Sequence, residues 1–139
     1  MDGTTVSHPL ALSLLSADGV ELLLAAELRF TASDPLAVEA LFDAGGDEPV
    51  RWVFSRDLLS SGLDHRIGEG DVVVWPTNDV DGIRVVHIRL RSPHGDALLE
   101  ASADAIQAFL VATWRLVPPG TEHKHLDVDG ALEALLGGS

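Results

Sequence analysis

The sequence VRWVFSRDLLSSGL, from Val50 to Leu63, changes from a strand pattern to a helix pattern at its centre. Val50, Trp52 and Phe54 share one face of a strand, because alternate side chains of a strand point to the same side of the sheet. Bulky apolar residues on a single face predict that this face is buried. We therefore expect Trp52 to lie in the core beside Phe54, against the helix that follows.

Ser55 marks the expected start of a short helix. Its hydroxyl can accept hydrogen bonds from the unpaired amides of the first turn, where Asp57 also suits the positive end of the helix dipole. Gly62 can end the helix in a left-handed backbone conformation. This helix must bury one side under the sheet, and we expect Leu59 or Leu63 to remain available at the surface.

The remainder of the chain is rich in strand patterns. From residue 20 to residue 30 every even position is apolar, whereas Glu21, Glu27 and Arg29 occupy odd positions, which is typical of a half-buried strand. Glycine-containing turns separate this segment from similar ones. The connections are too short for crossovers, so we expect mostly antiparallel pairing. The chain should contain about seven strands, near residues 6–14, 20–30, 37–43, 49–54, 71–75, 83–91 and 96–101.

Two more helices are expected towards the end of the chain. The first begins at Ser102 and ends before Pro118, and the second begins near Asp127 or Asp129. Together these elements predict one α+β domain over residues 1–139, with 1–5 and 137–139 flexible, in which three helices pack on a bent, mostly antiparallel sheet. The apolar stripes of the two later helices consist of Ile106, Phe109, Leu110 and Thr113, and of Val128, Leu132, Leu135 and Leu136.

Charge and cysteine content limit the function. The chain has 22 acidic and 9 basic residues, a formal net charge of -13, which opposes binding to nucleic acid and to anionic lipid surfaces. Such a charge either keeps the protein soluble or provides an acidic docking surface. The absence of cysteine excludes disulfides, thiolate metal sites and cysteine nucleophiles. Because no apolar run approaches the roughly 20 residues that span a bilayer, and no signal-peptide pattern is present, we expect a cytoplasmic protein without direct membrane insertion.

Few residues suggest chemistry. His123 and His125 would point to one side of an extended segment and could bind zinc, but a third ligand is missing nearby, so a structural or solvated loop is the alternative. The P-loop, dinucleotide-binding, zinc-protease and esterase motifs are all absent from the sequence. We therefore expect no enzyme activity, no metal and no cofactor.

The strand expected at residues 83–91 carries His87, Arg89 and Arg91 on one face and apolar residues on the other. The polar face is basic in an acidic protein. It is either a solvated face whose cations pair with carboxylates of neighbouring strands, or a contact with a subunit or partner.

Several motifs, in one order and at matching spacing, resemble those of the SsgA-like proteins, the sporulation and cell-division regulators of filamentous actinomycetes. The resemblance covers residues 20 to 136. Separate motifs in a fixed order are far less frequent by chance than one short motif. They are Asp34-Pro35, Arg56-Asp57-Leu58-Leu59 with Gly62-Leu63, Gly70-Asp71-Val72, Val74-Trp75-Pro76, Ser92-Pro93, Ala97-Leu98-Leu99-Glu100-Ala101 and Val117-Pro118-Pro119-Gly120-Thr121-Glu122-His123.

The resemblance implies a fold similar to the Whirly-type single-strand-binding proteins and a homo-oligomer, expected to be a trimer. It implies a non-enzymatic regulator that helps localise the tubulin-like division GTPase FtsZ to the cell septum during sporulation-specific division, with an SsgA-type relative as a further partner. A single-strand nucleic-acid-binding module is the alternative from another class, and a small metal-dependent hydrolase is the third. The candidate partner contacts are Arg56, Leu59 and Leu63 on the short helix, and His87, Arg89 and Arg91 on the basic strand face.

Overall fold

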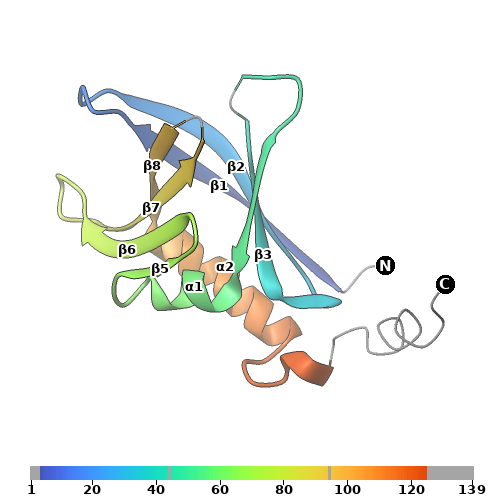
Figure 1. The fold of residues 1–139 in the computed structure, drawn as a ribbon. Helices are drawn as coiled ribbons and strands as arrows, with labels where there is room; N and C mark the ends of the chain where they lie inside the picture. The colour runs from blue at the N-terminus through green and yellow to red at the C-terminus, as the bar shows by residue number, and fades with distance from the viewer. Residues whose placement is uncertain (1–3, 44, 94, 125–139) are drawn as a thin grey trace.

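The computed structural model describes residues 4–43, 45–93 and 95–124. Within these residues eight strands form one antiparallel sheet in the order β4-β3-β2-β1-β8-β7-β6-β5 (Figure 1). Strands that follow each other in the sequence pair as neighbours within each half of the sheet, and the pairing of β1 with β8 joins the halves. The strands are β1 (Thr5–Leu15), β2 (Glu21–Thr31), β3 (Asp34–Phe42), β4 (Val50–Ser55), β5 (Ile67–Glu69), β6 (Val72–Asn78), β7 (Arg84–Ser92) and β8 (Gly95–Ser102).

The expected α+β class and the bent antiparallel sheet are confirmed, with one strand more than the sequence predicted. The additional strand, β5, has only 3 residues and pairs with β6. Its central residue is Gly68, so the segment shows no alternation of apolar and polar side chains. The first strand also begins earlier than expected, because Thr5 already pairs with Thr31 of β2.

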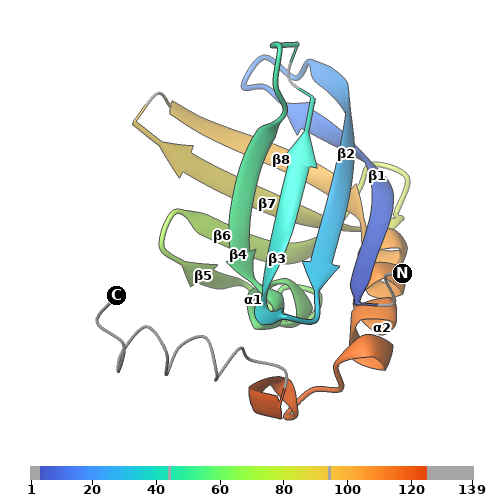
Figure 2. The ribbon, with the colours of Figure 1, turned by 90° about the vertical axis from the view of Figure 1, so that its right-hand side faces the viewer.

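The sheet curls around two helices, α1 (Arg56–Ser61) and α2 (Ala103–Leu116), which lie against its concave face (Figures 1 and 2). The curl brings the two edge strands together. The Ser55 hydroxyl at the end of β4 donates a hydrogen bond to the Glu69 carboxylate of β5, with 3.2 Å between the oxygens. The sheet is therefore almost closed, and α1 fills the corner between its two edges.

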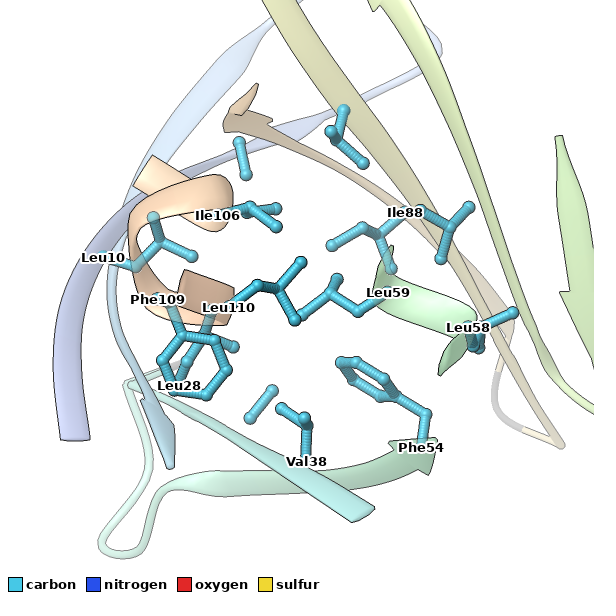
Figure 3. Close-up of a cluster of buried hydrophobic side chains, with 14 of the residues drawn as sticks. Leu10, Leu28, Val38, Phe54, Leu58, Leu59, Ile88, Ile106, Phe109 and Leu110 are labelled. Carbon is cyan, nitrogen blue, oxygen red and sulfur yellow. The ribbon is translucent and has the colours of Figure 1, made fainter. Parts of the chain in front are cut away.

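The core lies between the concave face and the helices. Leu59 of α1 and Leu110 of α2 extend toward each other at its centre, close to Phe54 and Ile88 of the sheet (Figure 3). Trp52 packs on the edge of this cluster, beside Phe54 as expected, but it is only partly buried. Its side chain borders a small apolar cavity that Leu59 and Ile106 of the two helices also line.

The second strand is less completely covered than its pattern predicts. Leu24, Leu28 and Phe30 are buried, but Val20 and Leu22, which lie at the same parity, are 62% and 56% exposed. The strand extends beyond the region that the helices cover, so the apolar face continues where no other element packs on it. The third helix that we expected near residues 127–136 lies outside the described residues, and the last described element is a 3-10 helix, η1 (Glu122–Lys124).

The start of α1 agrees with the sequence, whereas its end does not. The Ser55 hydroxyl accepts a hydrogen bond from the Leu58 amide at 3.0 Å, as expected for an N-cap. Gly62 does not adopt a left-handed conformation, because its φ is -65° and its ψ is -14°. Glycine is needed there for close packing: a Cβ atom on Gly62 would lie 2.2 Å from Cγ1 of Val74 on β6.

We therefore expect Gly62→Ala to lower the free energy of unfolding by about 1–3 kcal/mol, because Val74 is fully buried and β-branched and has little room to move. Gly68→Ala is the matched control. A Cβ at Gly68 would lie 3.4 Å from the nearest atom, an ordinary contact, and should change stability by less than about 0.5 kcal/mol. Urea denaturation of the three proteins checks this, and equal midpoints would contradict it.

Candidate partner-binding surface

The expected basic face of β7 is present. His87, Arg89 and Arg91 point to the convex side of the sheet, and the alternate residues Val86 and Ile88 are buried against the helices. The assignment of faces from the alternating pattern is thus correct for this strand.

These cations are paired with carboxylates of the neighbouring strand β8. Nε2 of His87 lies 2.9 Å from a carboxylate oxygen of Glu100, and Arg89 donates to Asp96 at 2.9 Å. Arg91 shares the same carboxylate at 3.8 Å. The interpretation as a paired, solvated face is therefore confirmed for the protomer. Two guanidinium groups share one carboxylate, and the Arg89 and Arg91 side chains remain 36% and 58% exposed.

Two aromatic contacts on the same face were missed by sequence reasoning. Trp75 of β6 pairs across the sheet with His87, and their rings meet edge to face with 5.6 Å between centroids. The guanidinium of Arg66 lies over the Trp75 ring, 4.5 Å from its centroid, which is a cation–π arrangement. The register between β6 and β7 brings Trp75 to His87, and the pairing of β5 with β6 brings Arg66 near Trp75, so no local sequence signal could have identified these contacts.

The candidates on α1 are not at the surface. Leu59 is fully buried, Leu63 is 6% exposed and Arg56 is 1% exposed. The expectation that Leu59 or Leu63 remains available was wrong, because α1 is enclosed by β3, β4, β5 and α2 rather than lying on an open face. Burial in the protomer removes all three residues as partner contacts of the folded chain.

Arg56 instead joins distant parts of the structure. Its guanidinium donates to the backbone oxygen of Val117 at 2.8 Å and to that of Thr113 at 3.3 Å, which satisfies carbonyls at the end of α2. It also donates to the Glu122 carboxylate at 2.6 Å and stacks over the Phe30 ring at 4.9 Å. A buried guanidinium needs such partners, because an unpaired buried charge is very costly.

Glu122 completes this arrangement from the segment after α2. Its own backbone amide is the main group that lowers the pKa of the Glu122 carboxyl, and the hydrogen bond from Arg56 lowers it further. A second carboxylate oxygen of Glu122 accepts from the Gly120 amide at 2.8 Å. The carboxylate therefore fixes the turn that follows Pro119 against the body of the protein.

We expect Arg56→Ala to lower the free energy of unfolding by about 3–5 kcal/mol, because it opens a buried site and leaves carbonyls and a carboxylate without their donor. Arg51→Ala is the control, since Arg51 is 62% exposed and its ion pair with Glu39 lies at the surface. That substitution should cost less than about 1 kcal/mol. Denaturant unfolding monitored by tryptophan fluorescence measures both, and comparable losses would contradict the role assigned to Arg56.

The Glu122 carboxyl should also make stability depend on pH. Its pKa is lower in the folded chain than in the unfolded one, so its contribution is present above about pH 4.3 and is lost as the pH falls through the folded value. We expect the wild type to be more stable than Glu122→Gln at pH 7, with a difference that shrinks below about pH 4. Urea titrations over this range check it, with Glu48→Gln in an exposed turn as the control for removal of one charge. A difference that is constant with pH would contradict it.

The described residues contain neither a cluster of metal ligands nor a membrane-spanning helix. Among them, no group of three or more His, Asp or Glu side chains is arranged to hold a metal ion. His123 is exposed on η1, and its proposed companion His125 lies outside the described residues. No described helix combines the length and the apolar character that crossing a membrane requires.

Comparison with known proteins agrees with the motifs. The family model described as Streptomyces sporulation and cell division protein, SsgA, matches residues 24–122. The chain belongs to the SsgA family. It is 50% identical over 133 residues to the sporulation-specific cell division protein SsgB of Streptomyces coelicolor, covering 96% of each chain. It is 39% identical over 130 residues to SsgB of Thermobifida fusca, covering 94% of each. The resemblance to the SsgA-like proteins seen in the sequence is confirmed, and these two relatives are of the SsgB type.

Solved structures of SsgA-family proteins have the same fold. The chain superposes on SsgB of Streptomyces coelicolor with a TM-score of 0.84 at 50% identity, covering 88% of this chain and 96% of that one. It superposes on the SsgA-like sporulation-specific cell division protein of Thermobifida fusca with a TM-score of 0.86 at 38% identity, covering 98% of each chain. The protein is therefore a member of a family of actinomycete sporulation and cell-division proteins with the SsgB architecture.

Proposed function

We propose that this SsgA-family protein is a non-enzymatic regulator that binds FtsZ directly and helps localise it to septum sites in the cytoplasm during sporulation-specific division. Membership of a family of sporulation-specific cell-division proteins carries this proposal. An SsgA-type relative is its further partner. The contact requires no nucleotide, metal or catalysis by this chain.

The convex face around His87, Arg89 and Arg91 is the candidate contact. FtsZ is expected to be acidic, and this chain has a formal net charge of -13, so the overall charges repel each other. Binding then needs a local patch where cations remain accessible. Arg89 and Arg91 meet this requirement, because they share the Asp96 carboxylate and stay partly exposed. The α1 candidates do not meet it, since they are buried.

Arg89→Glu should therefore reduce the amount of protein that pellets with polymerised FtsZ by at least about tenfold, equivalent to 1.4 kcal/mol in affinity. Arg29→Glu is the matched control. Arg29 is likewise an arginine on the convex side, 43% exposed and paired with Glu27 and Glu39, but it lies on β2 in the other half of the sheet. It should pellet as the wild type does.

Both variants must keep the circular dichroism and mass of the wild type for this comparison. Wild-type protein that stays in the supernatant at tens of micromolar contradicts direct recruitment. Equal losses in Arg89→Glu and Arg29→Glu would show that general charge, rather than the β7 face, controls binding.

We also propose that the protein is a homo-oligomer, which the family resemblance predicts to be a trimer. The exposed apolar residues at the end of the β1–β2 hairpin support association, because such side chains are normally covered in a stable assembly. The mass of the chain in solution decides the stoichiometry.

Single-strand nucleic-acid binding has one observation in its favour, namely the Trp75 ring beside Arg66 and Arg89 on the convex face. Aromatic rings can stack on bases. The Trp75 ring is nevertheless occupied by Arg66, and Arg29 and Arg51 pair with acids on the other half of the sheet. We therefore propose that nucleic acid is not a partner at physiological salt.

A further inference from the structure

The β1–β2 hairpin and the β7–β8 hairpin lie side by side where β1 pairs with β8, and they separate towards their tips. β1 pairs with β8 only from Leu12 to Leu15, opposite Ala101 to Leu98. Beyond Leu98 the start of β8 has no strand partner on this side among the described residues. The β1–β2 hairpin and the β7–β8 hairpin therefore end apart from each other, as Figures 1 and 2 show. We call the two hollows that border Ala97 at this divergence the hairpin cleft.

The hairpin cleft has apolar side chains on both faces of the sheet, and Arg89 and Asp96 also border its convex side. On the convex side, Leu15, Trp75 and Leu98 border a hollow of about 400 Å³. On the concave side, Leu14 and Leu22 border one of about 530 Å³. Ala97 contributes to both hollows, so they lie on opposite faces of the same stretch of β8.

The β1–β2 hairpin is apolar on both faces where it borders the cleft. Leu22 and Leu23 point to opposite sides of the strand and are 56% and 72% exposed. Neither α1 nor α2 reaches this end of the sheet (Figure 1). Exposed aliphatic side chains on both faces of a projecting hairpin indicate a surface that another segment covers.

The C-terminal segment of this chain has the complementary chemistry. Residues 125–139, HLDVDGALEALLGGS, lie outside the described residues. Spaced as in a helix, their aliphatic residues form a narrow stripe flanked by carboxylates, with no lysine or arginine in the segment. The aliphatic stripe suits the leucines of the cleft. The stripe is Val128, Leu132, Leu135 and Leu136, and the acids are Asp127, Asp129 and Glu133.

Geometry assigns this segment to the cleft of a second copy. α2 starts after β8 and runs away from the cleft, so that Lys124 lies at the opposite end of the molecule (Figure 1). The 14 residues of α2 alone span about 21 Å, whereas a helix over residues 126–136 would span only about 16 Å. Such a helix cannot turn back to the cleft of its own chain.

We propose that the C-terminal segment 126–136 of one protomer docks in the hairpin cleft of the next. This proposal rests on the self-association proposed above, and it names the contact responsible. The two surfaces that meet are different, so the interface is head-to-tail, and a rotation that closes it produces a ring.

Two full-length variants test the contact. Leu132→Glu with Leu135→Glu disables the segment, and Leu22→Asp with Leu23→Asp disables the cleft at side chains that are exposed in the protomer. Light scattering at tens of micromolar should give an oligomer for the wild type and a single chain of 14.7 kDa for each variant. Val80→Asp is the control, because Val80 is a fully exposed aliphatic residue in the β6–β7 turn, and it should keep the wild-type mass.

Mixing separates a docking defect from a folding defect. The cleft variant still has an intact segment and the segment variant an intact cleft, so one contact should form between them. Because the chain has no cysteine, Ala134→Cys in the cleft variant and Ala17→Cys in the segment variant should give a mixed disulfide under mild oxidation. When the same two cysteines are placed in two copies of the cleft variant, this disulfide should not form.

Three results would overturn the proposal: a wild-type mass of one chain, a wild-type mass in either variant, or no enrichment of the mixed disulfide over the cleft-variant pair. Failure of the wild type to pellet with FtsZ would leave all these masses and crosslinks unchanged. The two proposals therefore fail independently.

Discussion

The buried guanidinium of Arg56 is the interaction on which the arrangement of the helices depends. α1 and α2 both lie inside a sheet that is almost closed, and neither could be enclosed there with unsatisfied backbone groups at its end. Arg56 supplies donors to carbonyls at the end of α2 from the first turn of α1, while its guanidinium stacks over the Phe30 ring. Its Nη2 donates to Glu122 and thereby fixes the chain after α2. One side chain thus connects both helices, the sheet and the segment that leads to the C-terminus.

This interior leaves the convex face and the open end of the curl for contacts with other molecules. In the motif Arg56-Asp57-Leu58-Leu59 the arginine and both leucines are buried, and Gly62, shortly after it, allows α1 to approach Val74. The most family-specific part of the sequence is therefore explained by packing. Partner recognition in this SsgA-family protein then has to use residues that the fold leaves exposed, such as the two arginines of β7 that share the Asp96 carboxylate.

The two proposed surfaces are adjacent but chemically different. The β7 face presents guanidinium groups that are only partly neutralised, whereas the hairpin cleft presents aliphatic side chains. Arg89 borders both. An assembly built through the cleft would place the β7 faces of successive protomers at regular positions around a ring, and several weak contacts with a polymer then act together. Self-association and partner binding are thus compatible on one protomer.

The sequence by itself determined the faces of the strands, the N-cap at Ser55, the antiparallel connections and the family, because each depends on residues close together in the chain or on motif order. The tertiary structure alone decided which apolar positions are covered. The alternation in β2 is the same at Leu22 and Leu28, but the helices reach only one of them. It also decided that Arg56 points inward, since its partners lie 57 to 66 residues away, and that Trp75 meets His87 across a strand register. Whether a residue is at an odd or an even position of a strand determines which face its side chain points to. Whether that side chain is buried depends on which elements from other parts of the chain pack on that face.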